Sequence, residues 1–527
     1  MTKLTFSLLT IFALSFSLPI AGAQEKLGTV DFPISCSAEA QAQFNRAVAM
    51  LHSFWFPQAP KAFTAVSETD PNCAMAHWGI AISQRANPLV GAPDAAVLKR
   101  GLASVERAKA IGAKTQRERD YINAIELFYK DSDKLDHRTR VLAYEKAMER
   151  LYLAYSDDPE AAVFYALALN EAIDFEDKTY SRQLKAAQIL EKVYGKQPDH
   201  PGALHYLIHS YDFAPLASRG LDTAKRYASV APSAPHALHM PSHVFSMLGL
   251  WQESIKSNKE ALGVAKNYVH AMDFMVYAYL QGAQDGEAKR LLEESAALYK
   301  AQAPTAELTP TGGVLTVHTA FAAIPARYAI ERGAWADAAA LQPRPSTPAA
   351  DAITHFTRAM GAVRSGNAGA ARKDIEQLET LRNTLSTAKQ KYWADQVEIQ
   401  RRAATAWVAQ AEGNKSEALK WMRSAAALED SSEKQPAMEN RLWPMRELLA
   451  EMLFQMNEHA QALKEFEASF KAAPNRFRGY YGAAKAAERL GDQKKAKAYY
   501  EKLVTLCKQA DGQRPELVEA QAFLAKR

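Results

Sequence analysis

The sequence predicts an all-α solenoid, a fold in which pairs of antiparallel helices stack along one axis. Runs of alternating β-branched residues are nearly absent from the 527 residues, whereas apolar residues recur at helical spacing. Four stretches share one design, a Gly or Asn turn followed by alanine and aromatic residues: "GDQKKAKAYYEKLVTL", "NEHAQALKEFEASFKAAP", "GNKSEALKWMRSAAAL" and "GLWQESIKSNKEAL". Because one helical pair cannot bury its apolar face alone, such units are expected to stack on one another.

These units resemble the tetratricopeptide repeat, whose helix–turn–helix period is about 34 residues. Three stretches carry the turn, aromatic, small and closing positions of the motif: Phe56, Ala59, Phe63 and Pro71; Gly249, Trp251 and Ala261; Gly491, Ala496, Tyr500 and Leu503. The resemblance covers most of residues 40–510. It implies a right-handed superhelix of about ten to twelve units. Ser254 stands where alanine is usual, and stretches 85–135 and 340–400 require insertions or longer helices.

The N-terminus predicts export. Lys3 precedes the apolar stretch "LTFSLLTIFALSFSLPI", and "AGA" precedes Gln24, which is the pattern of a secretory signal cleaved near Ala23. An uncleaved membrane anchor is the alternative. We expect a periplasmic or secreted protein without stable membrane insertion. We divide the chain into a signal peptide at 1–23, an N-terminal segment at 24–39, an N-terminal repeat array at 40–340 and a C-terminal array at 341–527.

The three cysteines fit an exported chain, because disulfides form outside the cytoplasm. The repeat frame brings Cys73, at the end of the first helical pair, close to Cys36, so these two are expected to pair. Cys507 is expected to be a buried free thiol. The sequence contains no C-x-x-C stretch, which excludes thioredoxin-type redox chemistry and c-type haem attachment.

Charge and motif content exclude further classes. The net charge of +5 comes from 64 basic and 59 acidic residues without a long basic run, so nucleic acid is not an expected partner. The sequence has no Gly-rich phosphate loop, H-E-x-x-H stretch or Ser-His-Asp order. We therefore assign no catalytic residue.

Histidines are concentrated in one part of the chain. Of 13 in total, six lie between positions 205 and 270: His205, His209, His236, His239, His243 and His270. Pairs of them are separated by one period of the repeat: His205 with His239, His209 with His243, His236 with His270, and also His239 with Asp273. Residues in equal register occupy equivalent positions on successive helices, so these side chains are expected to lie on one surface.

The resemblance to tetratricopeptide repeats also indicates which surface this is. His236, His239 and His243 fall at positions two, five and nine of their unit, on one helical stripe. In that family the stripe faces the concave groove and not the core. Pro241 lies between the last two histidines and predicts either a kink or a helix that begins at the proline.

A cluster of this kind favours a transition metal, because neutral imidazole is a common metal ligand. Histidines four residues apart on a helix can chelate together, with a third ligand from a neighbouring helix. The candidate ligands are His205, His209, His236, His239, His243, His270 and Asp273. Seven ligands exceed one tetrahedral site, so either two metals bind or some residues orient others; Tyr206, Asp212 and Tyr277 are candidates for orienting the ligands. Copper and zinc are the first choices, and iron is a further one.

Three alternatives remain open. The groove could bind an anion, or a protein or peptide partner, without metal, which is the usual role of such scaffolds. The histidines could form a structural hydrogen-bond network. A bound metal could be catalytic, as in a hydrolase or oxidase, with Glu171, Asp174 or Asp212 as the base. The stretches "CAMAHWGIA" and "APHALHMPSHVFSMLG" are similar to exported bacterial tetratricopeptide proteins, a likeness that implies fold and location but no activity.

Overall fold

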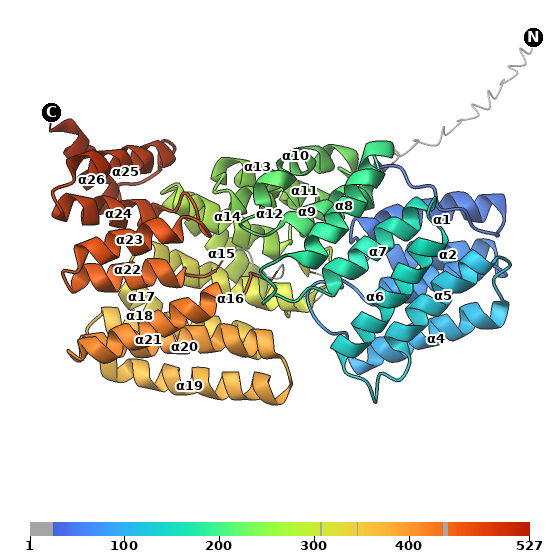
Figure 1. Ribbon diagram of the computed structural model, residues 1–527, viewed down its shortest axis with the longest axis horizontal. Helices are drawn as coiled ribbons and strands as arrows, with labels where there is room; N and C mark the ends of the chain where they lie inside the picture. Colours follow the sequence, from blue (N-terminus) through green and yellow to red (C-terminus); the bar gives the residue numbers. More distant parts are fainter. Residues whose placement is uncertain (1–24, 306–307, 345, 436–440, 527) are drawn as a thin grey trace, which may run out of the picture.

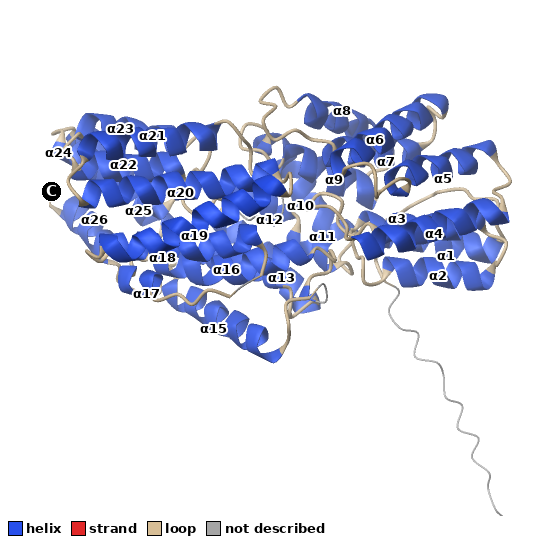
Figure 2. Cartoon of the chain, turned by 90° about the horizontal axis from the view of Figure 1, so that it is seen from below, coloured by secondary structure: helices blue, strands red, loops and turns tan. Residues whose placement is uncertain are grey.

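A computed structural model describes residues 25–305, 308–344, 346–435 and 441–526. Throughout these residues the regular structure is helical, with no strand (Figure 2). The predicted all-α solenoid is confirmed. The helices are α1 (Ala38–His52), α2 (Ala59–Thr69), α3 (Ala74–Gln84), α4 (Ala95–Ile111), α5 (Gln116–Tyr129), α6 (His137–Ala154), α7 (Pro159–Glu171), α8 (Ser181–Lys196), α9 (Pro201–Tyr211), the 3₁₀ turn η1 (Ala217–Gly220), α10 (Leu221–Val230), α11 (Pro235–His239), α12 (Pro241–Met247), α13 (Trp251–Val264), α14 (Val269–Gln281), α15 (Asp285–Ala301), α16 (Val314–Glu331), α17 (Trp335–Ala339), α18 (Pro348–Arg364), α19 (Ala368–Thr387), α20 (Lys391–Ala411), α21 (Lys415–Asp430), α22 (Met445–Gln455), α23 (His459–Ser469), α24 (Phe477–Arg489), α25 (Gln493–Leu506) and α26 (Pro515–Ala525).

Local sequence explains where the helices begin and end. The Ser37 hydroxyl accepts a hydrogen bond from the Ala40 backbone N–H at the start of α1, and Thr115 and Glu118 form a capping box at the start of α5. The expected turn glycines Gly249 and Gly491 have φ angles of +66° and +76°. Side chains with a Cβ rarely adopt this left-handed conformation, so glycine favours the turn between paired helices at both positions.

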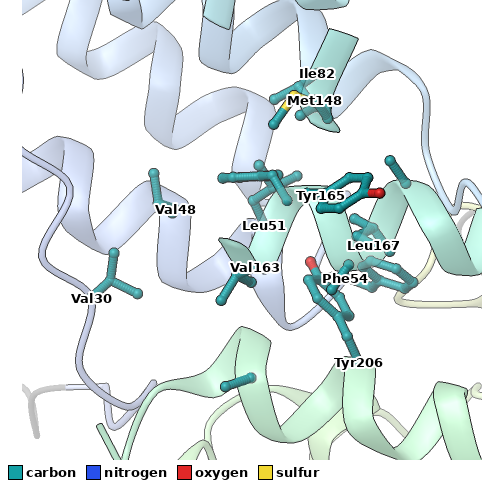
Figure 3. Packing of buried hydrophobic residues seen from close by; sticks show 14 of the residues in the cluster. Val30, Val48, Leu51, Phe54, Ile82, Met148, Val163, Tyr165, Leu167 and Tyr206 are labelled. Atoms are coloured by element: carbon teal, nitrogen blue, oxygen red, sulfur yellow. The ribbon is translucent and has the colours of Figure 1, made fainter. Parts of the chain in front are cut away.

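Consecutive helices pack side by side along the chain, and Figure 1 shows the repeats running from the N-terminal helices to α26 at the opposite end. The buried apolar residues form three large clusters, at 27–245, 251–324 and 283–520. Figure 3 shows part of the first cluster, where the rings of Phe54 and Tyr206 lie 5.8 Å apart. This cluster borders the histidine-rich helices, because Phe54 also contacts His205, with 4.5 Å between ring centroids.

The first repeat is joined covalently by a disulfide between Cys36 and Cys73, which are 37 residues apart. Cys507 is a buried free thiol in the structure. Over the described residues, no helix combines the length and apolar character needed to cross a bilayer. The expected signal peptide at 1–23 lies outside the described residues.

One segment of the C-terminal half reaches the N-terminal repeats. The segment 431–435, which follows α21, contacts three earlier repeats: the Glu433 N–H donates to the Phe175 carbonyl (2.8 Å), the Gln435 amide donates to the Leu89 carbonyl (2.7 Å), and Lys434 pairs with Asp212 (3.1 Å). Further along, the Trp251 indole N–H donates to the carbonyl of Asn475 (2.7 Å). The concave side next to α9 and α12 is therefore occupied by the chain itself.

Candidate metal centre

Four neighbouring helices in the middle of the molecule carry the six histidines (Figure 1). Helix α9 carries His205 and His209, α11 carries His236 and His239, α12 carries His243 and α14 carries His270. Helix α11 ends at His239 and α12 begins at Pro241, because proline lacks the N–H that a continuing helix would need at this position. The break lies between two of the histidines, as Pro241 predicts.

The histidines form two groups of three. The first is His205, His209 and His236, and the second is His239, His243 and His270. In each group the ligand-capable nitrogens lie within 4.8 Å of one another. Each member of the second group comes one repeat period after its counterpart in the first, so the two groups are successive copies of one arrangement. Each group takes two histidines from one repeat and one from the next.

All six side chains are buried, with exposed fractions between 0% and 4%. The prediction that they line an open groove is therefore wrong. Two tertiary features cover them: the segment 431–435 contacts Asp212 next to α9, and aromatic rings such as Phe54 and Phe274 pack against the imidazoles. A site for an extended peptide directly on these histidines is not compatible with this burial.

Four imidazoles are held by Nδ1, their outer nitrogen; in one of them, His236, Nδ1 shares a hydrogen bond with the Tyr268 hydroxyl (3.0 Å), and the other three donate to an oxygen. His205 Nδ1 donates to the His52 carbonyl (2.6 Å), His239 Nδ1 to Asn258 Oδ1 (2.6 Å) and His243 Nδ1 to Asp212 Oδ2 (2.8 Å). These acceptors take the single N–H of a neutral imidazole and leave a lone pair on Nε2. Metal-binding histidines are commonly oriented in this way, with the outer N–H held by a carbonyl or carboxylate.

The inner nitrogens then face one another. The Nε2 atoms of His239 and His243 are 3.1 Å apart, and those of His205 and His209 are 3.0 Å apart. In the second group both atoms carry lone pairs, so their approach is repulsive unless a cation lies between them. His209 Nδ1 and His236 Nε2 are buried without a hydrogen-bond partner in the described structure. Of these two atoms, His236 Nε2 offers a buried lone pair that a cation can use.

The electrostatics keep these imidazoles neutral. Burial lowers the pKa of His205 to about 3 and that of His239 to about 4. Burial, together with the neighbouring histidines, also lowers the pKa of His209, His236 and His270 well below the ordinary value. Burial is also the largest cause for the lowered pKa of His243, followed by His239 and Lys434. The neutral form is the one that binds metal.

Asp273 is not a member of either group, which corrects the predicted ligand set. Its carboxylate accepts a hydrogen bond from Arg327 Nε at 2.9 Å, and the two form a buried ion pair. Tyr277 contacts two arginines: its hydroxyl accepts a hydrogen bond from Arg476, and the guanidinium of Arg327 lies over its ring. The hydroxyl of Tyr206 forms a hydrogen bond with His52, which is not one of the six histidines. Of the three expected orienting residues, Asp212 holds a ligand by a hydrogen bond to His243, and the ring of Tyr206 packs against that of His205 with 5.1 Å between centroids.

The series of histidines at one-repeat spacing is flanked on each side, one repeat away, by a carboxylate that pairs with an arginine. Glu171 stands one repeat period before His205 and pairs with Arg85 in the interior. Asp273 stands one repeat period after His239 and pairs with Arg327. At each of these positions an arginine neutralises the carboxylate and excludes a metal cation. Within the described residues, the series of histidines therefore forms two three-histidine groups and no third. Glu171 is thereby removed as a candidate base, and Asp174 caps its own turn through the Glu176 N–H.

Sequence reasoning missed a third buried group made of His52, Glu160 and His200. His52 Nε2 and His200 Nε2 donate to the two oxygens of Glu160 at 2.8 Å and 3.0 Å, and His200 Nδ1 accepts from the Ala203 N–H. Although burial raises it, the two histidines bring the pKa of Glu160 down to about 2. Every ligand atom here has a partner, so we interpret the group as a hydrogen-bonded link between α1, α7 and α9. No repeat spacing marks it in the sequence.

Sequence reasoning also missed the residues that orient the ligands from a distance. Asn258 on α13 holds His239, and its amide N–H₂ donates to the Ser254 carbonyl (2.8 Å), which directs Oδ1 toward the imidazole. Lys434 reaches Asp212 from 222 residues away in the sequence. Ser254 takes part through its backbone carbonyl, which any residue type would supply, so the sequence carries no signal of this network.

A cavity of about 560 Å³ lies next to the second group. Asp212, which binds His243, forms part of its wall together with Met247, Tyr277 and Lys434. Lys178, whose side chain is 39% exposed, also lines it, so the cavity extends to the surface. It gives small molecules a route to within one side chain of the histidines.

Comparisons with known proteins assign no family and no activity to the chain. No family model matches the chain, and no curated protein matches it. Among solved structures, the human IFIT1 dimer with m7Gppp-AAAA is 11% identical with a TM-score of 0.39, covering 82% of this chain and 90% of its own. Naa15/Naa10 bound to HypK-THB is 13% identical with a TM-score of 0.25, covering 92% and 73%. These neighbours give no support to the expected absence of nucleic-acid binding, which stays a prediction.

Proposed function

We propose that this protein binds two transition-metal ions, one in each three-histidine group, on an all-α scaffold of the tetratricopeptide type. The observation that carries the proposal is the direction of the imidazoles: Nδ1 of His205, His239 and His243 is bound outward, and Nε2 of each faces the Nε2 of another histidine in its group. Copper and zinc suit such imidazole sites best, with iron as a further candidate.

The competing interpretations are less well supported. In a structural hydrogen-bond network the imidazole nitrogens would face acceptors or donors, as in the group around Glu160, whereas the Nε2 atoms of His239 and His243 face each other at 3.1 Å. A peptide-binding groove would expose the histidines, which are buried. The proposed setting is outside the cytoplasm, in a periplasm or secreted, and the disulfide between Cys36 and Cys73 supports that setting.

Elemental analysis by plasma mass spectrometry tests the proposal. Untagged protein purified from an exported fraction is expected to contain up to two equivalents of copper or zinc, and the metal-free protein is expected to take up two on titration. Neither metal in the purified protein, combined with no uptake by the metal-free form, would contradict the proposal.

Asp212 is expected to tune the second site through His243. We predict that Asp212→Asn weakens metal binding at that site by roughly 10- to 100-fold and leaves the first site unchanged, because a carboxylate that holds an imidazole raises its basicity. A competition titration with a chelator measures both sites. Since the single variant leaves Lys434 buried without its carboxylate, Asp212→Asn combined with Lys434→Gln is the control for folding. Unchanged affinity in both variants would rule out this role.

A further inference from the structure

The two histidine groups are in direct contact with each other. Ring centroids of His236 and His239, which belong to different groups, are 5.7 Å apart, and those of His209 and His243 are 6.0 Å apart. Within the groups the corresponding separations run from 4.8 Å for His205 and His209 to 6.4 Å for His209 and His236. Rings of different groups are therefore as close as rings of the same group, and the six imidazoles form one continuous cluster.

We propose that this cluster is a single dinuclear copper centre that binds dioxygen between its two metals. The inference rests on the proposed function, because it requires one metal ion in each group. Functional two-metal sites place their ions about 3.5–4 Å apart, so that one small ligand bridges both. The contacts between His209 and His243 and between His236 and His239 place the two ligand sets side by side, with no other residue between these rings.

Charge selects copper over zinc at this place. All six ligands are neutral, and Asp212, the carboxylate that touches His243, is already paired with Lys434 at 3.1 Å. Two divalent ions would bring four positive charges into a buried site without compensation, which is electrostatically unfavourable. Two copper(I) ions bring only two positive charges. Soft, univalent copper is also well served by imidazole.

The reaction with dioxygen keeps that charge constant. Each copper(I) gives up one electron and becomes copper(II), and dioxygen takes up both electrons and becomes peroxide. The oxygen–oxygen double bond becomes a single bond, and the peroxide binds between the metals without any proton transfer. The two negative charges of the peroxide offset the two positive charges gained by the metals. The cavity beside Asp212 extends to the surface at Lys178, so dioxygen can approach as far as the side chain that holds His243.

Anaerobic loading with copper(I), followed by addition of dioxygen, tests the inference. We expect two copper ions per chain, uptake of one dioxygen per two copper ions, and an intense near-ultraviolet band of bridging peroxide. The oxygenated protein should give no electron paramagnetic resonance signal, because bridged copper(II) ions couple. The variant combining His239→Ala and His243→Ala should bind one copper, lose the band and show an isolated copper(II) signal. His318→Ala, a half-buried histidine on α16 outside both groups, is the matched control and should retain the band.

Two outcomes overturn the inference and are distinguishable from each other. Two bound copper ions that each give an isolated copper(II) signal, with no peroxide band, would leave the proposed metal binding intact but reject the dinuclear centre. Failure to take up copper or zinc at all would reject both the centre and the proposed function.

Discussion

Replacing His239 and His243 together by alanine is expected to reduce the metal content from two ions to one per chain. The change removes two of three ligands from the second group, and the remaining His270 cannot hold a metal alone. The first group keeps His205, His209 and His236, so one ion should stay bound. The equivalent change one repeat earlier, His205→Ala with His209→Ala, should have the same effect on the other ion. Elemental analysis together with titration of the metal-free protein measures both.

The controls separate loss of ligands from loss of fold. Far-ultraviolet circular dichroism should show nearly unchanged helical content, because the helices of a solenoid are stabilised by contacts along the whole array. Glutamine at the same two positions keeps more of the side-chain volume and should lose the metal equally. His318→Ala should retain both ions. Two ions bound to either double variant would show that the metal site lies elsewhere.

Acid is expected to destabilise the metal-free protein steeply. An ordinary histidine in the unfolded chain has a pKa near 6.5, whereas burial lowers the pKa of His239 to about 4 and that of His205 to about 3 in the folded protein. Below about pH 6.5 the unfolded chain therefore takes up protons at these sites and the folded protein does not. The free energy of unfolding falls as the pH falls, until the folded pKa values are reached. These two residues alone contribute a loss of about 3 kcal/mol per pH unit over this range.

Urea unfolding of the metal-free protein between about pH 7.5 and about pH 5.5 measures this slope. The double variant His239→Ala with His243→Ala provides the comparison, because it lacks two of the buried imidazoles and should have a shallower slope. Bound metal should shift the transition to higher urea at neutral pH, and it should be released as the pH falls, because protons compete for the same nitrogens. A slope identical in the native chain and the double variant would show that these histidines are not buried in the neutral form.

Much of the fold and part of the site could be predicted from the sequence. Helices and turns follow local preferences, and the glycine turns at Gly249 and Gly491 have the left-handed backbone that the repeat pattern requires. The separation by one repeat period, seen first between His205 and His239, identified all six histidines that form the two groups. It also added Asp273, because a carboxylate in equal register cannot be told from a ligand by spacing alone.

The sequence by itself thus determined the helical repeat and the shared register of the histidines. Only the tertiary structure decided that they divide into two groups of three, that they are buried, and that Arg327 excludes Asp273. Repeat periodicity records interactions between neighbouring helices, which are local in the chain. The contact of Lys434 with Asp212 joins residues 222 positions apart, and it exists because the segment after α21 reaches the end of α9. No local sequence pattern records this long-range contact, so the burial of the histidines could not be predicted from the sequence.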